Sequence, residues 1–229
     1  MPSFAAPGLP RWKRILDLAL AALGLPFLAT ATFAVSLLHA LVSPGPLFFR
    51  QSRVGHLGRT FTLYKFRTMR AGADEAAHRR HLAALAAGGG PLRKLDQERD
   101  NRVFPGGRFL RASGIDELPQ LVNVLRGEMS VVGPRPSLAY ELGLHPRAQR
   151  ARVAVHPGLT GLWQVSGKNR TTFRTMLALD LRYARRRSPA LDLAIIALTP
   201  LALLREVAAA TRRPAPALSH PPRRPVSHS

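Results

Sequence analysis

Residues 111–136 read RASGIDELPQLVNVLRGEMSVVGPRP, and the local structure of this stretch decides how the rest of the chain is interpreted. Proline is tolerated inside a helix only in its first turn, so Pro119 places a helix start close to Asp116. Apolar residues follow at helical spacing, and Gly127 after a basic residue is typical of a helix end. The stretch therefore predicts a short amphipathic helix with two adjacent carboxylates, Asp116 and Glu117, at its N-terminus.

The start of a helix favours negative charge, because free N–H groups and the positive end of the helix dipole lie there. Asp116 is therefore expected to be ionised, as a nucleophile or a metal ligand must be. Successive helix residues project about 100° apart, so Asp116 and Glu117 cannot share one proton or flank one bond as paired acids do. We expect separate roles: one carboxylate contacts the substrate, and the other holds a divalent cation such as Mg²⁺, which prefers one or two carboxylates plus phosphate oxygens.

The same residues also allow a purely structural interpretation. Ser113 and Asp116 have the spacing of a capping box, and Glu117 would then only complement the helix dipole. From this stretch alone, both interpretations remain open.

Composition limits the chemistry that the chain can perform. Its 229 residues suffice for one domain with a core, and the lack of cysteine excludes disulfides, thiolate catalysis and cysteine-bound zinc. The eight histidines show no metal-site spacing, so any metal should be bound by oxygen. Lysine and arginine outnumber acidic residues by 34 to 13, and the net charge of +21 predicts an anionic partner: nucleic acid, acidic lipid or a phosphorylated substrate.

Residues 15–42 are nearly all apolar and exceed the roughly 20 residues needed to cross a bilayer. No clear signal-peptide cleavage site follows, so the segment should remain in the mature protein. Basic residues flank both ends, over 11–14 and 50–59, whereas a single crossing concentrates them on the cytoplasmic side. This symmetry, with Pro26 inside the segment, predicts a helix that enters one leaflet and returns; a spanning helix that tolerates Pro26 is the alternative.

The rest of the chain predicts an α+β domain that is mainly helical. Residues 47–54 and 59–69 have the pattern of a β-hairpin, and residues 74–87 have helical potential. The apolar run 191–204 is short for a membrane span and fits an interfacial or buried helix. The expected parts are a leader (1–10), a membrane helix (11–42), a cytoplasmic catalytic domain (43–210) and a disordered, basic, proline-rich tail (211–229).

A basic edge follows the membrane segment. It includes Lys65 and Arg67 and is uncompensated, because no acidic residue lies between Leu18 and Ala73. Two interpretations are open: binding of a headgroup or diphosphate, and simple attraction to acidic lipid, worth about 1 kcal/mol per cation.

Four separate motifs, in this order along the chain, are KRILDLALAALGLP, YKFRTM, GGRFLRASGIDELPQLVNVLRGEMSVVGPRP and HPGLTGLWQVSGKNR. Together they closely resemble the bacterial sugar transferases, in particular the small monotopic phosphoglycosyl transferases that act on polyprenyl phosphate. The likeness covers about residues 11–208. It implies a short family member with one re-entrant membrane helix and a catalytic domain on the cytoplasmic face of the bacterial inner membrane.

The resemblance implies transfer of a sugar-1-phosphate from a UDP-sugar to undecaprenyl phosphate, with UMP as the other product, at the start of exopolysaccharide or other surface glycan synthesis. In the family's pattern Asp116 would be the nucleophile and form a phosphosugar-aspartyl intermediate, while Glu117 would bind Mg²⁺. Arg111 and Arg135 would hold phosphate, since a guanidinium presents a planar bidentate fork.

Three further expectations are less specific. Lys65 and Arg67 lie in the YKFRTM motif and should contact substrate phosphate or anionic membrane lipids. Asp180 matches a recurrent acidic position in the family, with either an unassigned role or a salt bridge to Arg182 or another neighbour. A different class of function, a membrane-tethered basic protein that binds nucleic acid, fits the charge; however, the chain has no recognisable nucleic-acid motif, so no nucleic-acid partner is expected.

Overall fold

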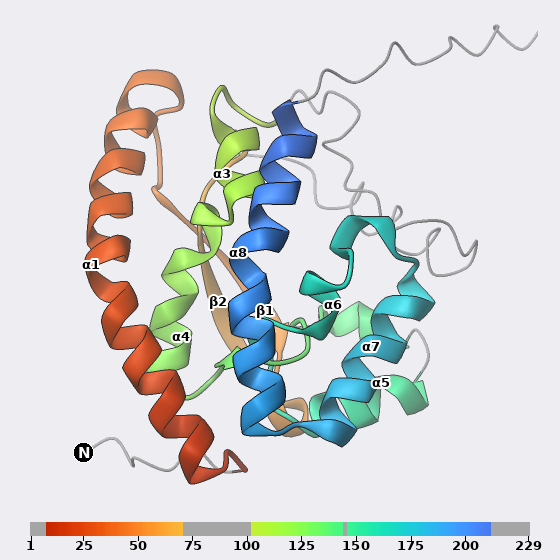
Figure 1. Ribbon diagram of the computed structural model, residues 1–229. Coiled ribbons are helices and arrows are strands. Elements are labelled where there is room, and N and C mark those ends of the chain that lie inside the picture. The colour runs from red at the N-terminus through yellow and green to blue at the C-terminus, as the bar shows by residue number, and fades with distance from the viewer. Residues whose placement is uncertain (1–7, 71–101, 144–145, 212–229) are drawn as a thin grey trace, which may run out of the picture.

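The computed structural model describes residues 8–70, 102–143 and 146–211 (Figure 1). Within these ranges the chain is mainly helical, with a two-stranded antiparallel hairpin and a short two-stranded parallel pair. This confirms the predicted α+β, mainly helical fold. Outside the described residues lie most of the predicted leader (1–7), the predicted helix over 74–87 and the predicted tail (212–229).

The elements up to the parallel pair are α1 (Arg11–Val42), β1 (Phe48–Val54), η1 (His56–Gly58), β2 (Thr60–Phe66), α3 (Gly107–Ser113), η3 (Ile115–Gln120), α4 (Leu121–Arg126) and β3 (Ser130–Val132). They are followed by η4 (Ala139–Gly143), α5 (Pro146–Val153), β4 (Gly158–Thr160), α6 (Leu162–Val165), η5 (Lys168–Arg170), α7 (Phe173–Arg186) and α8 (Pro189–Thr211). In Figure 1, α1 runs along one side of the domain next to α4, and α5, α6 and α7 gather on the other side.

The predicted hairpin is confirmed: β1 pairs with β2 in antiparallel register from Phe48 opposite Phe66 to Val54 opposite Thr60. The side chain of Asn123 on α4 continues the hydrogen bonding at the outer edge of β2. Its Nδ2 donates to the carbonyl of Thr62 at 2.7 Å, and its Oδ1 accepts from the backbone N–H of Tyr64 at 3.3 Å. The buried Asn123 thus satisfies backbone groups that an edge strand would leave unpaired.

The start of α1 is held by charged side chains that are buried in the domain. Lys13 donates to the carbonyl of Val132 at 2.8 Å and pairs with Asp192 on α8. Arg14 donates to the carbonyls of Val124 and Leu125 at 2.6 and 2.8 Å, and so caps the end of α4. Both cations are buried in the folded protein. They therefore do not add to the exposed positive charge before the apolar helix.

The other end of α1 is fixed to the hairpin through Arg67. Its guanidinium donates to the carbonyl of Pro46 at 2.7 Å and to the hydroxyl of Ser43 at 2.8 Å, and the carbonyl of Arg67 lies 2.8 Å from Nε2 of His39. At 1.5 Å per residue, the 32 residues of α1 extend about 48 Å, and both ends contact the same domain. The helix therefore lies along the domain and does not project from it.

The predicted break at Pro26 is not seen, because α1 is helical across this residue. Gly24 has a packing role: an added Cβ would lie 2.7 Å from the Cδ1 atom of Leu121, so the glycine allows α4 to approach α1. Thr30 donates from its hydroxyl to the carbonyl of Pro26 at 3.0 Å. The re-entrant path of α1 stays a prediction.

Two helices, α1 and α8, are long and apolar enough to cross a membrane by length and composition. The apolar run predicted over 191–204 is thus part of a longer helix than expected, 23 residues from Pro189 to Thr211. On α8 only Asp192 and Ile195 are buried, and large apolar side chains such as Leu201 and Leu204 are exposed.

The parallel pair β3–β4 brings together two segments that lie far apart in the sequence, VVGPRP and HPGLTG. An added Cβ at Gly158 would lie 2.0 Å from the backbone nitrogen of Gly133, and one at Gly161 would lie 2.1 Å from the carbonyl oxygen of Gly133. Because these contacts are with backbone atoms, no side-chain movement can relieve them. Glycine at these positions lets the two backbones touch.

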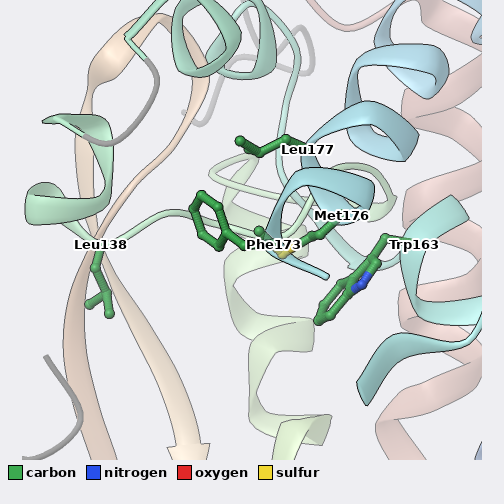
Figure 2. Close-up of a cluster of buried hydrophobic side chains, with 5 residues drawn as sticks. All are labelled: Leu138, Trp163, Phe173, Met176 and Leu177. Carbon is green, nitrogen blue, oxygen red and sulfur yellow. The ribbon is translucent and has the colours of Figure 1, made fainter. Parts of the chain in front are cut away.

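A cluster of buried apolar side chains supports the same region from the other side (Figure 2). Leu138, two residues after Pro136, packs with Trp163 of α6 and with three residues of α7. The loop that carries Arg135 is therefore fixed at its start by β3 and after its end by this cluster.

The close backbone approach predicts that Gly158→Ala destabilises the fold by more than about 3 kcal/mol, since overpacking against backbone atoms cannot relax through side chains. The measurement is the thermal unfolding midpoint of the detergent-solubilised protein. Gly143→Ala is the matched control, because an added Cβ there would meet nothing within 4 Å. Equal midpoints for the two variants would show that the contact between β3 and β4 is looser than described.

Candidate functional site

Asp116 lies at the start of a helical segment, as predicted, and the first turn is a 3₁₀ helix. Gly114 ends α3 with a φ of +75°, a left-handed conformation that favours glycine, and η3 then runs directly into α4. The side chain of Asp116 is buried, whereas Glu117 remains about one-third exposed. The two adjacent carboxylates therefore have different surroundings, as separate roles require.

The predicted capping box is wrong. Gly114, and not Ser113, is the N-cap of η3, and the Ser113 hydroxyl accepts only a long hydrogen bond, at 3.5 Å, from the N–H of Ile115. The hydroxyl of Ser113 donates back to the carbonyl of Phe109 at 2.8 Å, within α3. The structural interpretation of Asp116 as one half of a capping box therefore no longer applies.

Strand β2 packs against η3 and brings Lys65 to Glu117. The Lys65 ammonium lies 2.8 Å from Oε1 of Glu117, and both side chains are partly exposed, at 25% and 33%. Two residues that are 52 positions apart in the sequence are thus direct neighbours at the surface beside Asp116. This places a cation and two carboxylates together, as an enzyme of phosphate transfer needs.

Arg67 does not join this group. Besides Pro46 and Ser43, its guanidinium donates to the carbonyl of Met69 at 3.2 Å and stacks on Phe104. These contacts occupy the buried guanidinium in joining α1 to the hairpin. They do not support the predicted phosphate contact, so we assign Arg67 a structural role.

Arg111 and Arg135 approach the site from different elements. Arg111 lies on the last turn of α3, five residues before Asp116, and α3 packs directly on η3. Arg135 lies in the loop after β3, and its Nη1 is 3.1 Å from each carboxylate oxygen of the fully buried Glu141. Burial of the Arg135 guanidinium acts to lower its pKa, but the charges of Glu141, and more weakly of Asp180 and Glu117, outweigh burial and raise it. Arg135 is therefore cationic and lies within electrostatic range of Glu117.

Asp180 forms a salt bridge, as the structural alternative predicted, but its partner is Arg152 of α5 and not Arg182. The Nε of Arg152 lies 2.8 Å from Oδ2 of Asp180, and both side chains are 1% exposed. Burial raises the pKa of Asp180 to about 6, against the opposing effect of Arg152 and Arg135. Arg152 and Glu141 could not be predicted as part of this region, because single charged residues in a polar stretch carry no local signal of burial.

The donor set fits a magnesium ion that is bound mainly by substrate. Among the described residues, no group of three or more His, Cys, Asp or Glu side chains is arranged to hold a metal. Glu117 and Asp116 supply one or two carboxylates, which is the number that Mg²⁺ takes from protein when phosphate oxygens and water complete its shell. A tightly bound structural metal would require more ligands than this site has.

A sequence profile of the family described as bacterial sugar transferase matches residues 9–206, and the chain belongs to this family. The exopolysaccharide production protein ExoY of Sinorhizobium fredii is 40% identical over 186 residues, which cover 80% of this chain and 81% of ExoY. The UDP-glucose:undecaprenyl-phosphate glucose-1-phosphate transferase of Caulobacter vibrioides is 40% identical over 200 residues, or 84% of this chain and 69% of that protein. The galactosyl transferase CpsE of Streptococcus agalactiae is 41% identical over 82% of this chain but only 41% of CpsE. The chain is thus a sugar transferase, and the nucleic-acid-binding alternative is set aside.

The pair Arg135–Glu141 predicts a pH-dependent contribution to stability. Burial acts to raise the pKa of Glu141, but Arg135, Arg152 and Arg53 outweigh it and hold the pKa below its ordinary value of 4.5. The ionised carboxylate therefore stabilises the fold above pH 4.5, and this contribution is lost as the pH falls through the lowered pKa.

We expect Glu141→Gln to lower the free energy of unfolding at pH 7 by about 3 kcal/mol, because it leaves buried guanidinium charge unpaired. The difference from the wild type should shrink as the pH falls below 4.5, because the unfolded wild-type carboxyl protonates there and the folded one does so at its lowered pKa. Thermal unfolding midpoints across this pH range measure the effect. Glu206→Gln on α8 is the control for a half-buried glutamate, and a pH-independent difference for Glu141→Gln would contradict the charge argument.

Proposed function

We propose that this chain transfers a sugar-1-phosphate from a UDP-sugar to undecaprenyl phosphate and so starts synthesis of an exopolysaccharide or another surface glycan. The observation that carries the proposal is the placement of the buried Asp116 beside the Lys65–Glu117 pair. Relatives support the substrate class by their names: the Caulobacter vibrioides protein acts on UDP-glucose and undecaprenyl phosphate, and a Salmonella typhimurium relative is an undecaprenyl-phosphate galactose phosphotransferase.

In the first step, the carboxylate of Asp116 attacks the phosphorus that carries the sugar. The bond from this phosphorus to the bridging oxygen of the diphosphate breaks, and UMP leaves with the electron pair. The sugar phosphate is then joined to Asp116 as an acyl phosphate. Because Asp116 is only 7% exposed, water has little access to this reactive anhydride, which favours transfer over hydrolysis.

In the second step, a phosphate oxygen of undecaprenyl phosphate attacks the same phosphorus. The bond between the acyl oxygen of Asp116 and phosphorus breaks, which restores the carboxylate and gives a lipid-linked diphosphate sugar. No net proton transfer is needed, since both attacking groups are anions. One carboxylate therefore serves as nucleophile in the first step and as leaving group in the second.

The cations of the site stabilise the charge that spreads over the transferred phosphoryl oxygens. Arg111 and Arg135 hold the diphosphate, and Lys65 orients Glu117 and adds positive charge. Glu117 would hold Mg²⁺ together with the diphosphate, and the bound ion would supply further charge neutralisation.

The membrane acceptor requires an anchored enzyme, and α1 fits this requirement. Its exposed apolar side chains include Leu23, Phe27, Phe33 and Leu41. We propose that α1 inserts into the bacterial inner membrane with both ends on the cytoplasmic side, next to anionic lipids, and that the catalytic domain stays on that face.

The central test is UMP release by the detergent-purified protein with Mg²⁺, undecaprenyl phosphate and a panel of UDP-sugars. Wild type should release UMP with at least one donor, and Asp116→Asn should reduce release by more than about 10³-fold, because the amide is a poor nucleophile and cannot form the anhydride. Chelation of the metal should also stop release. Mass spectrometry of acid-quenched protein with donor alone should show the mass of a sugar phosphate added to wild type and not to the variant.

Activity that survives Asp116→Asn would overturn the assignment of the nucleophile. Asn123→Ala is not a suitable control because it disturbs β2, whereas Thr211→Ala removes an exposed hydroxyl that donates to the carbonyl of Ala208 within α8 and should leave release unchanged. Lack of release with every UDP-sugar, despite a folded wild type, would overturn the proposed donor.

The orientation of α1 can be tested with single cysteines, since the chain has none of its own. Arg11 is the first residue of α1, and Phe48 begins β1, six residues after α1 ends; both side chains are exposed, so Arg11→Cys and Phe48→Cys report on the two sides of the helix. Both should react in intact spheroplasts only with a membrane-permeant maleimide, and not with an impermeant one. Reaction of just one of them with the impermeant reagent would show that α1 spans the membrane.

A further inference from the structure

The loop from Gly133 to Ser137 presents Arg135, and buried charged side chains hold its backbone. Arg152 donates through Nη2 to the carbonyl of Arg135 at 2.7 Å and through Nη1 to the hydroxyl of Ser137 at 3.1 Å. Arg53 donates to the carbonyl of Pro136 at 3.2 Å. The backbone N–H of Arg135 also lies near the carboxylate of Asp180 and helps to lower its pKa against the effect of burial. Each residue around Arg135 is thus fixed by a hydrogen bond from a distant element.

Asp180 orients the guanidinium of Arg152, which makes two of these hydrogen bonds. Its carboxylate binds Nε of Arg152 at 2.8 Å, which directs the two Nη atoms of the same guanidinium toward Arg135 and Ser137. The planar fork of arginine transmits this orientation, because its donors have a fixed geometry. A shift of Asp180 would therefore move the loop through Arg152.

The Asp180–Arg152 ion pair is expected to add little to the stability of the fold. Both side chains are 1% exposed, and the desolvation of two buried charges offsets most of their attraction. The hydrophobic cluster around Leu138 and Phe173 already packs this region. What the ion pair supplies, and apolar packing does not, is a defined direction for the Arg135 backbone.

We propose that Asp180 and Arg152 are positioning residues for Arg135, and that they set the geometry in which Arg135 meets the sugar-bearing phosphate. This inference rests on the proposed function, since it assigns the phosphate to Arg135. Asp180 acts through Arg152, with which it forms an ion pair, and makes no contact of its own with the phosphate.

The positioning depends on pH. The charged groups that face Asp180 are Arg152 from α5 and Arg135 from the loop; Glu141 from η4 faces these arginines and not Asp180. Burial raises the pKa of Asp180 to about 6. Below this pH Asp180 is neutral and its ion pair with Arg152 is lost, whereas Glu141 stays ionised because its pKa is lowered. The hold on Arg135 should weaken as the pH falls through 6.

A double-mutant cycle separates positioning from general destabilisation. Asp180→Asn should lower kcat/KM for the UDP-sugar by about tenfold in wild type but by less than about twofold in an Arg135→Gln background, because its effect passes through Arg135. A purely structural role would produce the same factor in both backgrounds, and that result would overturn the proposal. Thermal midpoints of all four proteins verify that they are folded at the assay temperature.

Two further variants guard against a fold defect. Asp180→Glu retains the charge and should recover part of the activity lost in Asp180→Asn. Arg152→Lys retains a cation but lacks the fork, so it should lose activity to a similar degree as Asp180→Asn. Full activity of Arg152→Lys would contradict the role of the guanidinium.

The pH profile gives a readout that destabilisation does not mimic. The ratio of wild-type to Asp180→Asn kcat/KM should rise from about three at pH 5.5, where a group with a pKa of about 6 is roughly one-quarter ionised, to about ten at pH 7.5, since the variant mimics the protonated carboxyl. Ionisation of the lipid phosphate affects both proteins equally and cancels in the ratio. Arg150→Gln, an exposed charge on the same helix as Arg152, should show a ratio near one throughout. A ratio that is flat across this range for Asp180→Asn would overturn the proposal.

Binding of UDP, measured by calorimetry on the same variants, distinguishes this inference from the proposed function. If wild type binds UDP but releases no UMP with any donor, the proposed function fails while the coupling of Asp180 and Arg135 can still be measured as affinity. If Asp180→Asn weakens UDP binding by the same factor with and without Arg135→Gln, the positioning role is overturned. A wild type that neither binds UDP nor releases UMP would overturn both.

Discussion

The backbone of β3 is buried at the centre of the molecule, and its N–H and C=O groups must be satisfied there because water cannot reach them. Lys13 and Tyr183 both donate to the carbonyl of Val132, and Asp17 accepts from the N–H of Val131 at 2.8 Å. Pro157 accepts from the N–H of Ser130. The three residues of β3 thus contact α1, α7 and the segment before β4. The need to satisfy the backbone of β3 therefore fixes where these three segments lie.

The catalytic groups depend on that arrangement in two directions. Toward the C-terminal side, β3 leads directly into the loop of Arg135, so the same fixed strand sets where the loop begins. Toward the N-terminal side, Arg14 caps α4 and thereby holds the helical segment that starts beside Asp116. Asp116 and Arg135 lie on different segments, but contacts with the start of α1 hold both segments. The position of the proposed membrane helix and the geometry of the site therefore depend on the same contacts.

Local features of the sequence predicted those parts of the molecule that local forces determine. Pro119 located the helix start at Asp116, and alternating residues located the hairpin. The partners of buried charges could not be predicted, because they are remote: Lys13 and Asp192 are 179 positions apart, and Arg135 and Arg152 are 17. For the same reason the sequence does not show that the guanidinium of Arg67 binds the carbonyl of Pro46 and the hydroxyl of Ser43 at the end of α1. Periodicity reports which face of an element is buried but not which charge it meets.

The distance in sequence between Lys13 and Asp192 has a consequence for biosynthesis. The apolar helix leaves the ribosome first, long before Asp192, Tyr183 or the carbonyls of α4 have been made. During that interval Lys13 and Arg14 are solvated cations at the edge of a hydrophobic segment, which is the signal that the insertion machinery reads to keep a flank in the cytoplasm. Only later does folding bury them. Under the proposed topology, the same two side chains thus act in succession, first as a topological signal during translation and then as buried hydrogen-bond donors that hold α1 to the folded domain.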